Sequence, residues 1–185
     1  MRVGVFLGGR AERMGGISKP LLELASGETI LGRTLRIIED AGMRPVLLGP
    51  TPSILASLAP PELPRVDDAL PNHGPLGALV ALLERYAEPV IALAGDMPYV
   101  SSDLLRRLHR EHPDAPILAP RSGQHWEPLC ARYDGARVGP VARQRLEAGT
   151  LSLQGLLDAL PATALHVDDP GTLRDWDTPE DVRGT

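Results

Sequence analysis

Residues 2–7 read RVGVFL and lead directly into GGRAERMGGISKP at residues 8–20. The first segment is a short apolar run that ends at a glycine pair, which predicts a buried β-strand. The second segment places four glycines and the cations Arg10, Arg13 and Lys19 in a chain whose formal net charge is -5. Because glycines let backbone N–H groups approach an oxyanion and cations neutralise it, this loop is predicted to bind a polyphosphate. The alternative is a surface loop whose cations are solvated.

The composition indicates an ordinary globular chain and argues against several classes of protein. Of the 185 residues, 43% are hydrophobic and 23% are charged, as expected of a single domain spanning residues 1–185. The acidic balance and the scattered aromatic residues argue against a nucleic-acid partner. No apolar run approaches the roughly 20 residues that span a bilayer. No segment resembles a signal peptide, so we expect a cytoplasmic protein without a membrane partner. Cys130 is the only cysteine, which excludes a disulfide within the chain.

Segments with the pattern of strands alternate along the chain with segments that have the period of helices. Strands are expected at residues 3–7, 45–48, 64–66, 90–94, 117–119, 127–133 and 165–167, and helices at about 29–41, 76–86, 101–112, 136–148 and 152–160. This alternation requires crossover connections and predicts an α/β fold with a mainly parallel sheet. Ligands of such sheets bind at the carboxyl ends of the strands. That rule selects the segments after Leu7, Leu48 and Ala94.

Asp96 follows the most apolar of these strands and precedes Met97 and Pro98. A carboxylate at a strand end can hold Mg²⁺, a hard cation that prefers oxygen ligands and usually keeps some water. The ion would bridge phosphate oxygens of a nucleotide while an incoming phosphate attacks in line, so no protein nucleophile or general base is needed. The alternative role for Asp96 is to stabilise the N-terminus of the following helix.

Asp67 and Asp68 are adjacent carboxylates shortly before Gly74. Such a pair can accept hydrogen bonds from the N1–H and the exocyclic amine of guanine, a donor pattern that no other base offers. Asp68 fits the spacing slightly better than Asp67. For either residue, the alternative is a solvated acid in a turn.

Five motifs, in order along the chain, resemble those of the small nucleotidyltransferases. They are GGRAERMGG at 8–16 followed by Lys19, HGPLGAL at 73–79, LAGDMPYV at 93–100, EPLCARY at 127–133 and WDTPEDV at 176–182. The group that they resemble most is the molybdenum cofactor guanylyltransferases, which join GMP from GTP to molybdopterin and release pyrophosphate. The resemblance implies a three-layer α/β/α Rossmann-like nucleotidyltransferase fold, magnesium dependence, and molybdopterin or another phosphorylated compound as acceptor. It also implies contacts with proteins of cofactor synthesis or molybdoenzyme maturation.

The residues and the resemblance together give the expected site. Arg13, Lys19 and Asp96 are expected to be catalytic. Asp96 is the expected metal ligand, and Asp177 is a candidate for the second. The GTP-binding residues are expected to be Leu7, Gly8, Gly9, Arg10, Arg13, Lys19, Asp67, Asp68, Gly74 and Asp96.

Departures from the family pattern keep two other functions open. The C-terminal motif often carries two asparagines where this chain has Asp175 and Asp177, which suggests the related cytidylyltransferases as strongly as the guanylyltransferases. The EPLCARY segment, in contrast, favours the guanylyltransferases over the cytidylyltransferases. The second candidate is therefore a cytidylyl or sugar-phosphate nucleotidyltransferase on the same scaffold. The third is a GTP-binding or cofactor-carrier module with little catalysis, against which Lys19 and Asp96 together argue.

Overall fold

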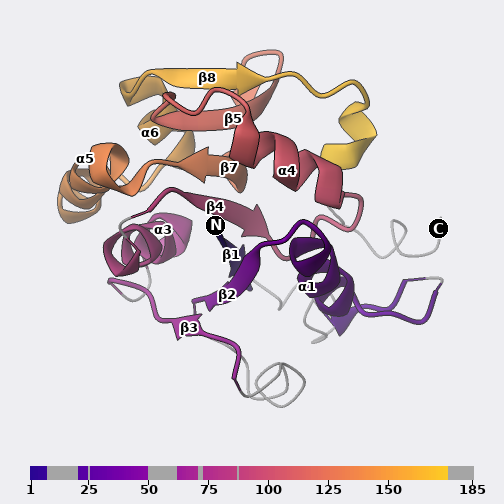
Figure 1. Ribbon diagram of the computed structural model, residues 1–185. Helices are drawn as coiled ribbons and strands as arrows, with labels where there is room; N and C mark the ends of the chain where they lie inside the picture. The colour runs from indigo at the N-terminus through magenta and orange to yellow at the C-terminus, as the bar shows by residue number, and fades with distance from the viewer. Residues whose placement is uncertain (8–20, 25, 50–61, 71–72, 87, 175–185) are drawn as a thin grey trace.

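The structure is a computed structural model that describes residues 1–7, 21–24, 26–49, 62–70, 73–86 and 88–174. In this part of the chain the centre is an 8-stranded sheet in the order β3-β2-β1-β4-β7-β5-β6, with β8 paired to β5. Helices cover both faces of the sheet, so the molecule has three layers (Figure 1). The predicted α/β fold with a mainly parallel sheet is confirmed.

Four parallel strands form one half of the sheet: β1 (Arg2–Phe6), β2 (Arg44–Leu48), β3 (Arg65–Val66) and β4 (Val90–Ala94). β1 lies between β2 and β4, and Phe6 is opposite Leu48 on one side and Ala94 on the other. Strands that are covered on both faces are apolar at consecutive positions rather than at alternate ones. This is why β2 and β4 are visible in the sequence as continuous apolar runs.

The other half of the sheet contains a strand of opposite direction. β7 (Cys130–Tyr133) is antiparallel to both of its neighbours, β4 and β5 (Ile117–Ser122). β5 turns back into β6 (His125–Trp126), and β8 (Ala162–Leu165) is parallel to β5. Because two antiparallel steps restore the direction, β5 and β8 run the same way as β4 and end at the same edge of the sheet.

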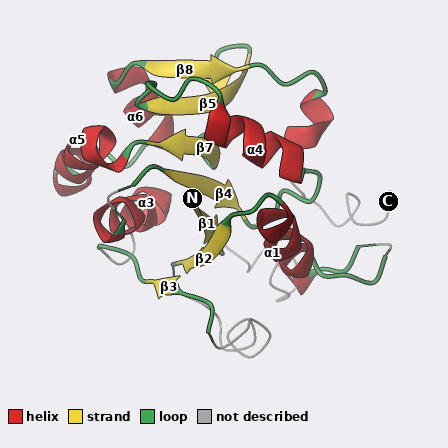
Figure 2. Cartoon of the chain, in the orientation of Figure 1, coloured by secondary structure: helices red, strands yellow, loops and turns green. Residues whose placement is uncertain are grey.

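Hydrophobic clusters fill the space between the sheet and the helices on each face. One face is covered by α3 (Gly74–Arg85), α5 (Gly135–Glu147) and α6 (Leu153–Ala159), and the other by α1 (Ile30–Asp40) and α4 (Ser102–Arg110) (Figure 2). Every residue of α3 from Leu76 to Leu83 is buried. A helix that is apolar all round belongs in a core, and α3 is accordingly enclosed.

Side-chain caps determine where four of the helices begin. The capping residues of α1, α4, α5 and α6 are Thr29, Ser101, Asp134 and Ser152. Each accepts a hydrogen bond from a backbone N–H of the first turn, which would otherwise lack a partner. A short 3-10 helix, η3 (Pro170–Leu173), follows β8. Among the described residues, no helix has the length and apolar character needed to cross a membrane.

Three strand predictions are wrong in extent, and β6 was not predicted; β5 continues to Ser122 where the sequence predicts an end at residue 119. The sequence predicts a strand at residues 165–167, whereas β8 spans Ala162–Leu165. Beyond Leu165 the backbone turns to α4, where the His166 carbonyl accepts a hydrogen bond from Arg107 at 2.8 Å. The sequence also predicts one strand over 127–133, but β7 begins only at Cys130. The preceding residues form a turn that contains Pro128, which has no N–H to donate to a sheet.

Candidate functional site

The carboxyl ends of β3, β2, β1 and β4 lie side by side along one edge of the sheet. Their last residues are level in the register: Val66, Leu48, Phe6 and Ala94. Neighbouring strands are about 4.8 Å apart, so the end of β3 lies about 14 Å from the end of β4. This edge therefore brings together the predicted base-reading acids after β3, the end of β1 and Asp96 after β4.

The ends of β1 and β4 are joined by a direct backbone contact. The Gly95 N–H donates to the Phe6 carbonyl oxygen at 3.0 Å, and the Leu7 N–H donates to the Leu48 carbonyl oxygen at 3.3 Å. Leu7, a predicted nucleotide contact, has its side chain in the core shared with α1 and α4. The chain thus leaves β1 from a fixed point immediately before residues 8–20.

Asp96 follows Gly95 and is half-buried at the end of β4. The helix-terminus role is taken by other residues, because Ser101 caps α4 and Asp103 supplies the acid of its first turn. No group of three or more His, Cys, Asp or Glu side chains that could hold an ion occurs among the described residues. A single carboxylate still suits Mg²⁺, which proteins usually hold through one or two carboxylates together with phosphate oxygens and water.

Two glycines make room for Asp68 at the end of β3. Gly49 directly follows β2 with a φ of +81°, and a Cβ on it would lie 3.4 Å from Asp68 Oδ1. Gly77 lies in the first turn of α3, where a Cβ would be 3.8 Å from the Asp68 Cβ and 3.0 Å from the Leu70 carbonyl oxygen. The Ala69 N–H donates to the Gly77 carbonyl oxygen at 3.2 Å and ties this loop to α3. Backbone of β2 and α3 thus lies close to the Asp68 side chain, which is partly buried.

Burial distinguishes Asp68 from Asp67. Asp68 Oδ1 is buried and accepts no hydrogen bond from any residue that the structure describes, whereas Asp67 is exposed. Loss of hydration raises the pKa of the Asp68 carboxyl, and the neighbouring charge of Asp67 adds to the rise. A buried acceptor without a donor is uncommon in folded proteins, and a ligand with hydrogen-bond donors would satisfy it.

Gly74 is the first residue of α3 and lies at the same edge as Asp68. It is exposed and has a φ of +63°. Because α3 connects the end of β3 to the start of β4, its N-terminus is at the carboxyl ends of the strands. Free backbone N–H groups at such a terminus favour an anion. The predicted nucleotide contact of Gly74 stays a prediction.

The EPLCARY motif supports the end of β4 from the side opposite β1. The Ala94 N–H donates to the Leu129 carbonyl oxygen at 2.7 Å. The Tyr133 hydroxyl donates to the Pro128 carbonyl oxygen, also at 2.7 Å, and Tyr133 is fully buried. The motif therefore belongs to the scaffold that holds the strand preceding Asp96.

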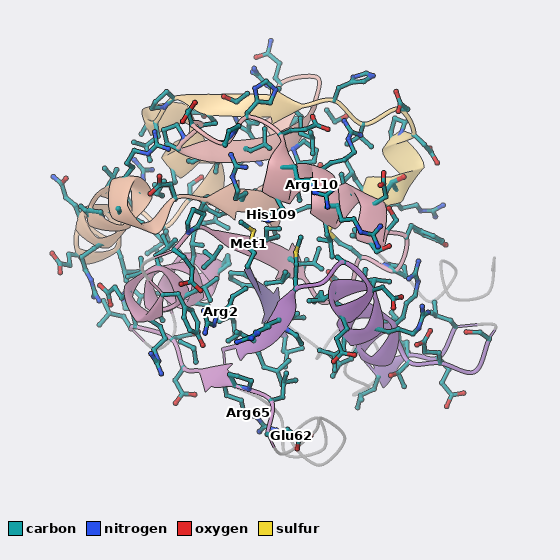
Figure 3. All side chains as sticks on the ribbon, viewed as in Figure 1. Met1, Arg2, Glu62, Arg65, His109 and Arg110 are labelled. Atoms are coloured by element: carbon teal, nitrogen blue, oxygen red, sulfur yellow. The ribbon has the colours of Figure 1, made fainter. Side chains whose placement is uncertain are left out.

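A cavity of about 630 Å³ lies at the opposite edge of the sheet, where the parallel strands begin. Arg2, labelled in Figure 3, forms an ion pair with Glu88 there and lies 4.2 Å from the centre of the Tyr86 ring. Three arginines and three glutamates face the cavity, so its charges balance, whereas a polyphosphate site needs a surplus of positive charge. The cavity is lined by Arg2, Glu39, Arg44, Pro45, Val46, Glu62, Leu63, Pro64, Arg85, Tyr86 and Glu88.

Part of the predicted site lies outside the described residues: Gly8, Gly9, Arg10, Arg13, Lys19 and Asp177. Their roles stay predictions. Sequence reasoning in turn missed Gly49, Gly77 and Gly95, which make the close approaches at this edge. Gly49 and Gly95 are visible in the sequence as residues that end apolar runs, but the atoms they approach belong to other segments of the chain.

Comparison with known proteins agrees with this arrangement. The family model described as MobA-like NTP transferase domain matches residues 3–163. A molybdenum cofactor guanylyltransferase of Pseudomonas entomophila is 30% identical over 183 residues, which cover 95% of this chain and 93% of the relative.

Two solved structures share the fold. Molybdopterin-guanine dinucleotide biosynthesis protein A from Archaeoglobus fulgidus has a TM-score of 0.79 at 21% identity, covering 99% of this chain and 95% of its own. Rv0371c from Mycobacterium tuberculosis, solved in complex with manganese, has a TM-score of 0.71 at 25% identity, covering 98% and 95%. Because the family model matches most of the residues and the Pseudomonas relative aligns almost from end to end, this chain belongs to the MobA-like NTP transferase domain family and is a nucleotidyltransferase.

Proposed function

We propose that this nucleotidyltransferase transfers GMP from GTP to molybdopterin, forming the guanine dinucleotide of the cofactor and releasing pyrophosphate. The observation that carries the proposal is the partly buried carboxylate of Asp68, whose Oδ1 is buried and has no donor among the described residues. It lies on the same sheet edge as Asp96 and the end of β1. The name of the Pseudomonas entomophila relative, molybdenum cofactor guanylyltransferase, supports guanylyl transfer to the molybdenum cofactor.

Guanine fits the Asp68 carboxylate because it presents two adjacent donors, the N1–H and the exocyclic amine. A carboxylate can accept both hydrogen bonds, either with one on each oxygen or with both on one oxygen. Adenine and cytosine each present an acceptor at the ring nitrogen beside the amine, which would face the charged oxygen unfavourably. The exposed Asp67 adds negative charge at the rim of the same site.

The order of the strand ends matches the order of the groups in a nucleoside triphosphate. With the base at β3, the ribose crosses β2 and the triphosphate reaches β1 and β4. There the backbone of residues 8–9 and the side chains of Arg13 and Lys19 would hold the phosphates, with Arg10 at the rim. Lys19 would act most strongly on the departing pyrophosphate, whose charge grows as the bond breaks.

The transfer depends on positioning and charge rather than on a protein nucleophile. An oxygen of the acceptor's phosphate attacks the α-phosphorus of GTP and forms the new P–O bond. The bond from that phosphorus to the bridging oxygen breaks, and pyrophosphate leaves with the electron pair. The attacking phosphate is already ionised at neutral pH, so no general base is required.

Asp96 is the residue of this chain that we propose to hold Mg²⁺, together with phosphate oxygens and water, with Asp177 as the candidate second ligand. The bound ion supplies neutralisation of the phosphate charge during transfer. The manganese complex of Rv0371c supports a divalent cation in a protein of this fold.

Competition binding of GTP and ATP to the wild type, Asp68→Ala and Asp67→Ala tests the assignment of the base. Loss of a hydrogen bond at a partly buried position costs ~1–3 kcal/mol, so Asp68→Ala should reduce the preference for GTP about 5–150-fold. Asp67→Ala is the matched control, because it removes the adjacent but exposed acid, and it should keep the preference. Equal preference in the wild type and Asp68→Ala would exclude the assignment. A wild type that prefers CTP would favour cytidylyl transfer, the reading that Asp175 and Asp177 suggest.

A further inference from the structure

Gly95 makes a close backbone approach between β4 and β1. Its N–H donates to the Phe6 carbonyl oxygen at 3.0 Å, and a Cβ on Gly95 would lie 2.8 Å from that same oxygen. Real Cβ atoms are essentially never found so close to another heavy atom. The oxygen belongs to the main chain in the middle of the sheet, so it cannot rotate away as a side chain can. Any other residue at position 95 must therefore move the end of β4 away from the end of β1.

Such a movement would fall on Asp96, because the end of β1 is held on its other side by the Leu7 N–H, which donates to the Leu48 carbonyl oxygen at 3.3 Å. β1 leads into the loop at residues 8–20, and Asp96 directly follows Gly95. On its other side β4 is held by the Ala94 N–H, which donates to the Leu129 carbonyl oxygen at 2.7 Å. The end of β4 is thus held between β1 and β7 up to the residue before Asp96.

We propose that Gly95 is a positioning residue that sets the distance between Asp96 and the end of β1. The inference rests on the proposed function, in which Asp96 holds Mg²⁺ and the loop holds the phosphates. Because Mg²⁺ requires near-ideal octahedral geometry, the affinity that it adds to nucleotide binding depends on this distance. Nucleotide binding without the metal does not use Asp96 and is insensitive to the residue at position 95.

Gly4, in the middle of β1, offers a matched control. A Cβ there would lie 2.6 Å from Leu48 Cδ1 and 2.6 Å from Leu82 Cδ2, which are the ends of flexible side chains. Gly4→Ala therefore crowds the same sheet but leaves the strand ends in place, because the leucines can change rotamer. It should lower the melting temperature without changing the effect of the metal.

The test is calorimetric measurement of the GTP dissociation constant in Mg²⁺ and in EDTA, with melting temperatures beside it. In Gly95→Ala, the gain in affinity due to Mg²⁺ should fall about 10–100-fold, the range found for residues that orient a metal ligand. The dissociation constant in EDTA should be unchanged, and Gly4→Ala should keep the full gain. Because both changes act through the same carboxylate, the double variant Gly95→Ala/Asp96→Asn should bind no more weakly than Asp96→Asn alone.

A Gly95→Ala protein that keeps the full gain from Mg²⁺ overturns the inference and leaves the proposed function intact. A wild type that binds GTP equally well in Mg²⁺ and in EDTA removes the metal role of Asp96 and the inference with it. If Gly95→Ala does not fold, amide hydrogen exchange of the wild type decides. The Gly95 N–H should exchange more slowly with GTP and Mg²⁺ than with GTP in EDTA, and equal exchange in the two conditions overturns the inference.

Discussion

Asp68 is a partly buried acid, and its Oδ1 loses contact with water without gaining a hydrogen-bond donor among the described residues. The pKa of this carboxyl is raised in the folded state above the value of about 3.9 usual for an aspartate in an unfolded chain. A raised acid pKa stabilises the fold below the unfolded pKa, and that contribution is lost as the pH rises through the folded pKa. At neutral pH the ionised Asp68 therefore lowers the free energy of unfolding. A carboxylate at this position does not serve stability, and we propose that it serves base recognition.

We expect Asp68→Asn to raise the melting temperature at neutral pH, because it replaces a poorly hydrated charge by a neutral side chain of the same shape. The difference from the wild type should shrink as the pH falls toward the usual aspartate pKa of about 3.9, because the wild-type side chain then becomes neutral like the amide. Thermal unfolding across this pH range measures the effect, with Asp67→Asn as the exposed control. A lower melting temperature for Asp68→Asn at neutral pH would show that the carboxylate is stabilised in the free protein.

Asp96→Asn should slow GMP transfer at least about a hundredfold, which corresponds to ~2.7 kcal/mol of barrier. The amide keeps the size of the side chain but loses the charge that attracts Mg²⁺. The melting temperature should change little, because Asp96 is half-buried at a strand end and outside the apolar clusters. Steady-state kinetics measure the effect, and Asp103→Asn, an exposed acid of α4, is the control. Near-normal turnover in Asp96→Asn would remove its metal role.

Among the elements, α4 is held at its C-terminal end by a buried cation of β7. Arg132 has only 3% of its surface exposed. Its guanidinium donates to carbonyl oxygens at and just beyond the end of α4, which lack partners within the helix. These oxygens belong to Leu108, His109, Glu111 and His112. Arg132 thus joins α4, the helix that follows Asp96 in the chain, to β7, the antiparallel strand beside β4.

Arg132→Met should lower the free energy of unfolding by about 1.5–3 kcal/mol, because buried carbonyls lose a charged donor. Urea denaturation measures it. Arg106→Met is the matched control from α4 itself, since Arg106 makes an exposed hydrogen bond to the Asp40 carbonyl, and its loss should cost well under 1 kcal/mol. Equal losses in the two variants would contradict this account of Arg132.

The elements most accessible to sequence reasoning are those whose pattern arises within the segment. β4 is a continuous apolar run and α4 starts at a serine cap, so both could be predicted. The direction of β7 could not, because it depends on where the chain returns to the sheet after the turn at Pro128. The sequence places the start of β8 three residues too far toward the C-terminus. Its ends are decided by its pairing with β5 and not by its local pattern.

For the whole molecule, saturating GTP with Mg²⁺ should raise the melting temperature more than ATP or CTP does. A ligand at a hundred times its dissociation constant adds about 2.7 kcal/mol to the free energy of unfolding, which is about 5–10 °C for a chain of this size. Thermal shift measurements with each nucleotide, with and without Mg²⁺, provide the check. Equal shifts with GTP and CTP would contradict guanine recognition.

The candidate site could be predicted in part, because its acids follow strands and such strand ends meet at one edge. Asp68 and Asp96 were accessible in this way. The partial burial of Asp68 was not, since Gly49 and Gly77 approach its side chain only when β2 and α3 pack beside the loop. Likewise, the approach of Gly95 to β1 belongs to the assembled sheet and has no signal within either strand.

The shortness of β3 has a consequence for how copies of this protein behave toward one another. An edge strand offers unpaired N–H and C=O groups that can template intermolecular β-pairing and aggregation. Here that edge is only two residues long, is preceded by Pro64 and opens with the exposed Arg65. Prolines, charged side chains and short strands at the edges of natural sheets reduce pairing with other chains. The parallel half of the sheet, although apolar throughout its interior, therefore gives a growing fibril little to extend at this edge.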